Sequence, residues 1–425
     1  MHACRSVVCA QFHARNHIDP RDGCCSDSFL PPRRRVVVSD GHSSESSSCC
    51  GPNQLRWRFG AVRDRTMSVQ VNRCVGHCAS LLLYAQVAMF QRILSATFIV
   101  AIAVALVIAA WPQLFSLEQT AGVAQVVSLR GLAAAVALVA VLGLTLISLL
   151  SVRMHRFTAS LAVVALVFSA LTVAVLATRG FGSPGFETKA DSDVTVLSWN
   201  TLGEAPGATA VADLALVNEA DVVTLPETTR EFGFEVAQLL SAAGRPMWVH
   251  TLAYDEISKS RSTTVLISVD LGEYDVDTST RTTSTLPSLV ATPQDGVGPT
   301  IVAVHAVAPI TGEMSNWRSD LEWLAEQCRS TNVIMAGDFN STIDHYASLT
   351  DGSEYALGSC RDAASVSDNA AVGTWPTQLP SLLGAPIDHV MASSEWTVTG
   401  MRVIESHDGF GSDHRPILAT LSPTQ

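Results

Sequence analysis

The chain has 425 residues, a mean hydropathy of +0.27 and 16% charged residues, so it is too apolar and too poor in charge to be wholly soluble. Its net charge of −12 is unevenly divided: residues 1–179 hold 16 Lys and Arg against 7 Asp and Glu, whereas residues 180–425 hold 11 against 32, a net charge of −21. A polyanion would approach this acidic C-terminal part against its electrostatic field, which disfavours long nucleic acid as a ligand. The length allows two or three domains.

Residues 1–88 show no sustained hydrophobic periodicity. They carry eight of the ten cysteines, a Pro-Pro-Arg-Arg-Arg run and a Ser-rich stretch. This composition predicts a disordered cytoplasmic extension. A second interpretation is a start codon placed too far upstream, with Met67 or Met89 as the true start.

Three apolar runs follow within residues 89–178, at 93–111, 131–150 and 158–176. None contains a charged residue, and each is long enough, at about 1.5 Å per residue, to span about 30 Å of hydrocarbon. Buried helices of a soluble protein are the alternative, which three such runs in series disfavour, and a cleaved signal peptide explains only the first run. We therefore predict three transmembrane helices, with the lipid bilayer as a partner.

The basic residues beside these runs predict their orientation. Arg92 precedes the first run, and Arg153 and Arg156 lie in the second connection, whereas residues 112–128 contain Glu118 and no Lys or Arg. By the positive-inside rule, the N-terminus and the second connection are cytoplasmic, and the chain after residue 177 lies outside the cytoplasmic membrane. Arg130, at the outer end of the second run, can snorkel to the interface.

Residues 179–192 contain three glycines and a proline, and we expect them to form a short flexible linker. Residues 193–425 then mix strand and helix patterns. Strands are predicted at 194–199, 221–225, 248–254, 263–271, 300–307, 333–336, 387–392, 397–404 and 416–421, and helices at 208–219, 229–243 and 315–330. This mixture predicts an α/β or α+β sandwich built around one sizeable core.

Only two cysteines lie in this C-terminal part, Cys328 and Cys360. In an oxidising compartment two lone cysteines often pair, so a disulfide is one interpretation. Two buried free thiols are the other.

Polar residues recur where the predicted strands end. Strand ends along one edge of a sandwich converge on one cleft, so these side chains are expected to meet there. Each has an ordinary alternative as a turn residue, a helix-terminal charge or a buried structural histidine. The candidates are Asn200, Glu227, His305, Asp338, Asn340, Asp388, Asp413 and His414.

One family has its motifs in the same order as this chain. The order Trp-Asn200, Pro-Glu227, His305, Gly-Asp-Phe-Asn340, Ile-Asp-His389 and Ser-Asp-His414 resembles the endonuclease/exonuclease/phosphatase superfamily, which includes deoxyribonuclease I-like nucleases, neutral sphingomyelinases and inositol polyphosphate phosphatases. The resemblance covers about residues 193–422. Its most specific part is Gly-Asp-Phe-Asn340 followed much later by Ser-Asp-His414. It implies a four-layered α/β sandwich, in which two central β-sheets are flanked by helices, and a Mg²⁺ (or Mn²⁺) cofactor.

The resemblance also implies a role for each candidate. Glu227 is expected to bind the metal, with Asp413 and Asn200 close to it. Asp338 is expected to orient or deprotonate the attacking water, and Asn340 to hydrogen-bond the phosphoryl oxygens. The remaining side chains are expected to act on the phosphate: His414, which Asp388 orients, and His305, as a second contact or the general acid. Independently of the resemblance, phosphoester cleavage needs a cation, an activated water and hydrogen-bond donors aimed at the transition state.

The sequence therefore predicts a membrane-anchored, metal-dependent phosphodiesterase or phosphatase with its active site outside the cytoplasm. Its substrate would be a lipid head group or small phosphoester, with nucleic acid less favoured by charge. An extracellular nuclease is the alternative within this class. A non-catalytic envelope or signalling module that keeps the fold is the alternative from another class, and the complete set of acid, amide and imidazole residues argues against it.

Overall fold

The computed structural model describes residues 9–12, 69–72, 75–182, 185–255, 257–352, 354 and 356–424, with side chains from residue 83 onward. It contains two compact units, residues 1–97 and 98–425. The predictions for residues 1–88 fall largely outside the described residues. Within the first unit, β1 (Cys9–Phe12) and β2 (Val69–Asn72) pair antiparallel, and α1 (Val75–Ala110) begins.

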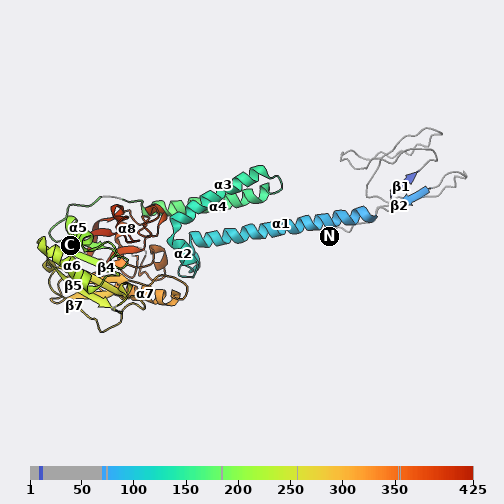
Figure 1. The fold of residues 1–425 in the computed structure, drawn as a ribbon. Coiled ribbons are helices and arrows are strands. Elements are labelled where there is room, and N and C mark those ends of the chain that lie inside the picture. The colour runs from blue at the N-terminus through green and yellow to red at the C-terminus, as the bar shows by residue number, and fades with distance from the viewer. Residues whose placement is uncertain are drawn as a thin grey trace. The chain divides into compact units, whose positions relative to one another are not determined.

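Among the described residues, three helices are long and apolar enough to cross a membrane, at Leu83–Ala110, Arg130–Leu150 and His155–Arg179. They contain most or all of each predicted apolar run. In the second unit, α3 (Arg130–Leu150) and α4 (His155–Arg179) lie side by side as an antiparallel hairpin (Figure 1). Small residues let the two helices approach, and Ser169 Oγ donates a hydrogen bond to Ala134 O at 3.1 Å.

A short connection joins α1 to this hairpin. It consists of the 3-10 helix η1 (Pro112–Phe115) and of α2 (Val123–Ser128). We call α3 and α4 the apolar hairpin, and residues 111–129 the connecting segment.

The rest of the second unit contains two six-stranded mixed sheets. The first has the order β13-β14-β3-β4-β6-β5, in which only β3 and β4 pair in parallel. The second has the order β11-β12-β10-β9-β8-β7, in which only β9 and β10 are parallel. The strands are β3 (Val194–Ser198), β4 (Val222–Pro226), β5 (Met247–Ala253), β6 (Ser262–Ser268), β7 (Tyr274–Val276), β8 (Leu289–Pro293), β9 (Thr300–His305), β10 (Val333–Asp338), β11 (Arg361–Asp362), β12 (Asp388–Ala392), β13 (Trp396–Val403) and β14 (Ile417–Pro423).

Side-chain alternation along the buried strands builds the layers. In β3, Val196 faces the core between the two sheets, whereas Leu197 faces the core under α5 (Ala208–Val217) and α6 (Arg230–Ala242). In β10, Ile334 belongs to the inter-sheet core, and Met335 packs toward α7 (Met314–Gln327). Both faces of each central strand are covered, which explains its continuous apolar run. The predicted four-layered α/β sandwich is confirmed.

Within residues 193–425, three strands and a short α-helix escaped the sequence prediction, namely β7, β8, β11 and α8 (Ala363–Val366). β7 has three residues, and β8 ends at Pro293 after a run that includes Thr292. Such short segments do not show a period that can be told from a loop.

Residues 179–192, expected to form a flexible linker, are hydrogen-bonded to the domain where the structure describes them. Ala371 N donates to Gly180 O at 3.2 Å, and Gly182 N donates to Asp368 O at 2.9 Å. Gly180 has a φ of +79°, and a Cβ there would lie 2.1 Å from Asp368 O. The glycine therefore serves a close backbone approach at this position, in addition to any flexibility.

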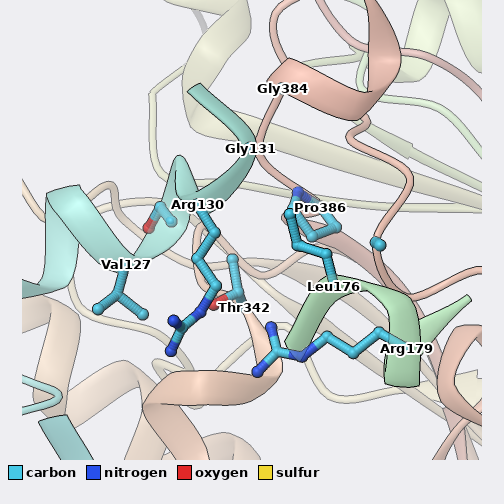
Figure 2. Close-up of a pocket in the computed structure, with 10 residues that line it drawn as sticks. Val127, Arg130, Gly131, Leu176, Arg179, Thr342, Gly384 and Pro386 are labelled. Atoms are coloured by element: carbon cyan, nitrogen blue, oxygen red, sulfur yellow. The ribbon is translucent and has the colours of Figure 1, made fainter. Parts of the chain in front are cut away.

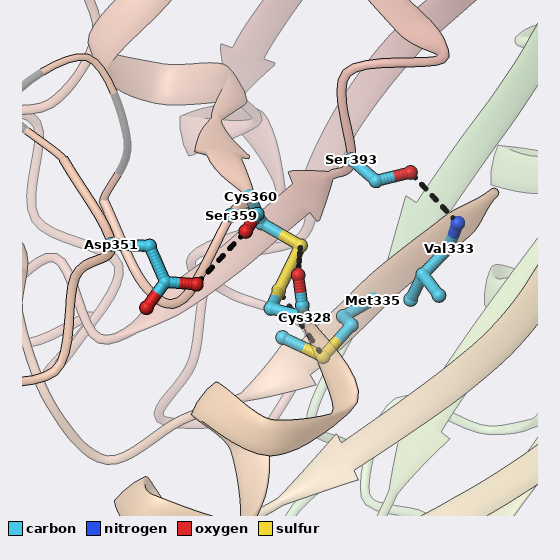
Figure 3. The surroundings of a disulfide bond; sticks show 7 residues. All are labelled: Cys328, Val333, Met335, Asp351, Ser359, Cys360 and Ser393. Carbon is cyan, nitrogen blue, oxygen red and sulfur yellow. Dashed lines mark hydrogen bonds between the residues drawn. A yellow bond between two sulfur atoms is a disulfide. The ribbon is translucent and has the colours of Figure 1, made fainter. Parts of the chain in front are cut away.

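Cys328 and Cys360 form a disulfide, with their Cα atoms 5.4 Å apart. Both are fully buried, and the bond joins the end of α7 to the chain just before β11. Figure 3 shows the bond beside Ser359, whose Oγ donates to Asp351 Oδ2 at 2.9 Å. The two cysteines are 32 positions apart, and the bridge closes a loop of the chain that contains β10 and the segment after it.

Candidate active site

Three neighbouring strands of the second sheet bring three candidate residues side by side. Asp338, the last residue of β10, pairs in register with His305 of β9 and with Asp388 of β12. Gly337 makes this pairing possible, because a Cβ at its position would lie 2.0 Å from Val304 O. Its φ of +151° also favours glycine. The Gly-Asp motif is thus explained by backbone packing as well as by chemistry.

The first sheet supplies the other candidates. Asn200 follows β3 and Glu227 follows β4, which are parallel neighbours, and His414 precedes β14, the other neighbour of β3. Asn200 Nδ2 donates to Asp338 Oδ2 at 3.0 Å and approaches Glu227 Oε1 at 3.4 Å. Its Oδ1 accepts a hydrogen bond from Leu202 N at 3.0 Å, which is consistent with this amide orientation. Asn200 therefore links the residues of both sheets.

His414 lies between two carboxylates. Its Nδ1 is 2.9 Å from Asp388 Oδ2, and its Nε2 is 3.7 Å from Asp338 Oδ2. Burial alone would lower the pKa of His414, but the charges of Asp388 and Asp338 outweigh it and raise this pKa to about 10. The side chain is therefore an imidazolium near neutral pH, with an N–H on each ring nitrogen.

Asp338 is the most connected carboxylate of the cluster. It accepts hydrogen bonds from Asn340 N at 2.9 Å and from Asn340 Nδ2 at 3.2 Å, besides the bond from Asn200. Burial raises the pKa of Asp338 to about 7, against the opposing charge of His414. Such a carboxylate can hold or release a proton in the physiological range.

Asn340 has a left-handed backbone, with a φ of +47°. Its Nδ2 also donates to Ala306 O at 2.9 Å, and its carbonyl oxygen accepts a bond from Trp317 Nε1 at 3.0 Å. A non-glycine residue adopts this conformation when its surroundings hold it there, and such strain often accompanies function.

His305 is fully buried, and its Nε2 lies 4.0 Å from Glu227 Oε1. Burial, reinforced by the charge of His414, lowers the pKa of His305 to about 3. Its Nδ1 has no hydrogen-bond partner in the described structure. His305 is therefore neutral near pH 7. It fits the expected second phosphate contact better than the expected general acid, which would have to be protonated.

Glu227 and Asp413 form the more open part of the site. Burial raises the pKa of the half-buried Glu227, and the negative charge of Asp413 adds to this effect. Asp413 Oδ2 accepts a hydrogen bond from Trp375 Nε1 at 2.9 Å, while its Oδ1 is buried without a partner among the described residues. Two carboxylates whose negative charges oppose each other suit a shared cation.

The described residues contain two groups that could hold a metal. The side-chain ligand atoms of Asp338, Asp388 and His414 all lie within 4.8 Å of one another. An imidazolium, however, has no lone pair to offer a cation, and both of these carboxylates already face His414. Asp388 Oδ1 and Asp413 Oδ1 are both buried without a partner among the described residues. Asp388 already pairs with His414, however, whereas the predicted group of Glu227, Asp413 and Asn200 has no such imidazolium bound to it and fits a hard cation better.

Several supporting residues were missed by the sequence prediction. Trp375 holds Asp413, Trp199 Nε1 donates to His414 O at 2.9 Å, and Ser412 Oγ donates to Asn200 O at 2.6 Å. Trp199 and Ser412 lie inside the quoted motifs, so their position was a usable signal. Trp375 lies 38 residues before its partner in an irregular segment and carried no such signal.

A sequence model described as the endonuclease/exonuclease/phosphatase family matches residues 197–414. No curated protein matches the chain. Among solved structures, the endonuclease/exonuclease/phosphatase from Beutenbergia cavernae DSM 12333 is 18% identical, with 55% of this chain and 72% of that chain covered and a TM-score of 0.41. D. rerio TDP2, complexed with single strand DNA product, is 17% identical, with 55% and 100% covered and a TM-score of 0.41. The family protein from Leptotrichia buccalis C-1013-b is 14% identical, with 54% and 99% covered and a TM-score of 0.42.

Proposed function

Because this chain belongs to the endonuclease/exonuclease/phosphatase family, we propose that it is a divalent-metal-dependent phosphoester hydrolase anchored in the cytoplasmic membrane. The observation that carries the proposal is the convergence of Asn200, Asp338 and His414 from two sheets onto one buried cluster. Residues that served only as turn residues or as isolated core histidines would not be expected to converge on one cluster.

The residues divide into one set that would bind the metal and a second set that would act on the substrate phosphate. Glu227, Asp413 and Asn200 would hold the cation, which when bound offsets the charge of the phosphoryl oxygens. The unpartnered, buried Asp413 Oδ1 supports this assignment, because a buried carboxylate oxygen normally has a partner. Mg²⁺ and Mn²⁺ both accept such oxygen ligands.

The second set of residues takes up a proton and donates hydrogen bonds to the substrate phosphate. Asp338 accepts a proton from the attacking water, aided by its raised pKa. His414 donates its Nε2–H toward the phosphoryl oxygens, while Asp388 fixes the ring through Nδ1. The neutral His305 provides a further hydrogen-bonding contact. Asn340 would contact a phosphoryl oxygen by releasing one of the bonds that its two amide hydrogens make to Asp338 and Ala306.

We place the catalytic domain, residues 193–425, outside the cytoplasm. The three apolar helices and the distribution of arginines support this orientation. The disulfide between Cys328 and Cys360 is also favoured by an oxidising compartment. The substrate we favour is a small phosphoester or a lipid head group, because the net charge of −21 from residue 180 onward opposes long nucleic acid.

The test uses the full chain in lipid nanodiscs with bis(4-nitrophenyl) phosphate and Mg²⁺. Glu227→Gln should lower kcat/KM by about a hundredfold or more, because a catalytic metal supplies several kcal/mol of transition-state stabilisation. EDTA should have the same effect, and Mg²⁺ or Mn²⁺ should reverse it. The matched control is Glu231→Gln, which changes an exposed carboxylate four residues further on in α6.

Activity that survives both exhaustive chelation and Glu227→Gln would refute the metal assignment. A wild-type protein inert toward phosphodiesters, phosphomonoesters, phospholipids and single-stranded DNA would favour the non-catalytic module instead. Preferential cleavage of DNA, with a steep loss of activity as salt rises, would favour the nuclease.

A further inference from the structure

A buried carboxylate, Asp344, joins the catalytic domain to both ends of the apolar hairpin. Arg130 Nε and Nη2 donate to its two oxygens at 2.7 and 2.8 Å, and Arg179 Nη1 and Nη2 donate at 2.7 and 2.6 Å. Arg130 is the first residue of α3 and Arg179 the last residue of α4, so the antiparallel hairpin brings them together. Figure 2 shows both guanidinium groups pointing to the same place beside Thr342.

The cluster lies away from water. The side chains of Asp344 and Arg130 are 2% and 5% exposed, and that of Arg179 is 15% exposed. Burial alone would raise the pKa of Asp344, but the two guanidinium groups outweigh it and hold this pKa well below its ordinary value. Two bidentate pairs on one carboxylate are also the geometry that arginine favours. Arg130, which the sequence suggested could snorkel to the membrane interface, is thus bound to a carboxylate of the domain.

The connecting segment adds contacts to the same place. Gln113 Nε2 donates to Asp344 Oδ1 and to Asp344 O, both at 3.0 Å, and Gln119 Nε2 donates to His345 O at 2.8 Å. Gly131 lies so close to the domain that a Cβ there would be 1.8 Å from Leu382 O. The hairpin is thus packed against the domain at several points besides its covalent link.

Asp344 is close in sequence to the proposed catalytic residues. It lies six residues after Asp338 and four after Asn340, in the 3-10 helix η4 (Ile343–Tyr346). Within this stretch Ser341 Oγ and Tyr346 OH are 2.7 Å apart, and Thr342 N donates to His345 Nδ1 at 2.9 Å. We call residues 338–346 the catalytic loop. β10 holds one end of it, and Asp344 holds the other.

We propose that the Arg130–Asp344–Arg179 cluster positions the catalytic loop, so that the apolar hairpin is a working part of the enzyme and not only an anchor. Asp344 touches no reacting atom; it is a positioning residue that acts through the backbone of Asn340. Asn340 is held from the strand side by hydrogen bonds to Asp338, Ala306 and Trp317, and Asp344 holds the chain that follows it. The kinetic part of this inference rests on the proposed function, whereas its structural part does not.

The experiment compares full-length variants in lipid nanodiscs by hydrogen exchange of amides 338–346 and by hydrolysis of bis(4-nitrophenyl) phosphate. Arg179→Gln removes one guanidinium, Arg179→Lys keeps the charge, and Asp344→Asn removes the shared carboxylate. The matched control is Arg245→Gln. Arg245 pairs with Asp221, which also lies between two cations, Lys189 and Arg245, elsewhere in the same domain.

Arg179→Gln should speed exchange of the catalytic loop by about tenfold or more, because unpairing a buried ion pair is strongly destabilising. It should lower kcat by about tenfold and leave KM within about twofold, since the loop acts in the transition state. Arg179→Lys keeps the charge but loses the bidentate contact, so it should recover only part of both losses, and Arg245→Gln should change neither. Asp344→Asn should exceed Arg179→Gln in both measurements if it folds.

Loop exchange in Arg179→Gln equal to that in Arg245→Gln would overturn the inference, as would an unchanged kcat in an active protein. If wild-type protein hydrolyses no phosphoester, the proposed function fails, and the exchange measurement alone still decides whether the cluster holds the loop.

Discussion

The two carboxylates beside His414 contact different ring nitrogens at different distances. Asp388 is 2.9 Å from Nδ1, which is a hydrogen bond, whereas Asp338 is 3.7 Å from Nε2, which is longer than one. Nδ1 is therefore committed to Asp388, and the Nε2–H remains available to a substrate oxygen near Asp338. Residue-scale geometry thus assigns the two nitrogens different tasks.

Asp388→Asn tests this division. Loss of the negative charge should lower the pKa of His414 from its raised value, so the imidazolium should be lost at a lower pH. We expect kcat to fall by about a hundredfold at neutral pH, within the usual range for acid–base groups. The alkaline limb of the kcat–pH profile should also move to lower pH.

The control for this prediction is Asp362→Asn, which removes a carboxylate from another buried histidine, His389, outside the candidate site. Its alkaline limb should stay at the wild-type pH. An unchanged limb in Asp388→Asn would remove the imidazolium of His414 from the mechanism.

The sequence allowed most of the candidate residues to be grouped because they follow or precede a continuous apolar strand. Strand ends on neighbouring strands meet, so the sequence alone allowed Asn200, Glu227, His305, Asp338 and Asp388 to be grouped. Asp344 could not be found in this way. Its partner Arg130 is 214 residues away, and nothing in the local pattern of either residue indicates the pair.

At the scale of elements, β11 and β12 are joined by a buried ion pair. His389 Nδ1 is 2.9 Å from Asp362 Oδ1, and His389 Nε2 is 2.9 Å from Ser341 O. Burial would lower the pKa of His389 and raise that of Asp362, but their mutual attraction reverses both shifts. The pair ties the edge of the second sheet to the catalytic loop.

These shifts predict a pH window for stability. The raised pKa of His389 contributes stability that is full below the unfolded value of about 6.5 and is lost as pH rises through the folded value. The lowered pKa of Asp362 contributes stability that is full above about 3.9 and is lost as pH falls through the folded value. The pair is therefore fully effective between about pH 4 and pH 6.5.

Asp362→Asn should cost about 3–5 kcal/mol within that window and less on either side of it. Thermal unfolding of the full chain, followed by tryptophan fluorescence from pH 3 to pH 10, measures the difference in Tm from wild type. A difference that is constant with pH would show that the pair is not ionised in the folded protein.

The central strands β3, β4, β9 and β10 were predicted well because they are buried along almost their whole length and their apolar runs are continuous. The edge strands β7 and β11 lack this signal, since they have three and two residues. Their position is set by pairing with β8 and β12, which is a tertiary effect.

At the scale of the whole molecule, ion pairs from Arg130 and Arg179 to Asp344 join the apolar hairpin to the catalytic domain. A fragment that begins after Arg179 would leave Asp344 without either guanidinium group and without Gln113. Such a fragment lacks the contacts that we propose to hold the catalytic loop, so its inactivity would not speak against catalysis. Activity is therefore best measured on the full chain.

The proposed orientation requires both ends of the apolar hairpin near Asp344 to lie on the outer side. Contacts within the second unit agree with this requirement, because the connecting segment and the domain bond to each other through Gln113 and Asp344. The turn between α3 and α4, which contains Arg153, would then face the cytoplasm.

An alkaline phosphatase reporter, which is active only outside the cytoplasm, tests this arrangement. Fused after Gly185, beyond all three apolar helices, it should be active; fused after Arg153, between α3 and α4, it should be silent. The two fusions differ by one apolar helix, so each is the control for the other. The opposite pattern would place the catalytic domain in the cytoplasm, and equal activity at both positions would mean that α4 does not cross the membrane.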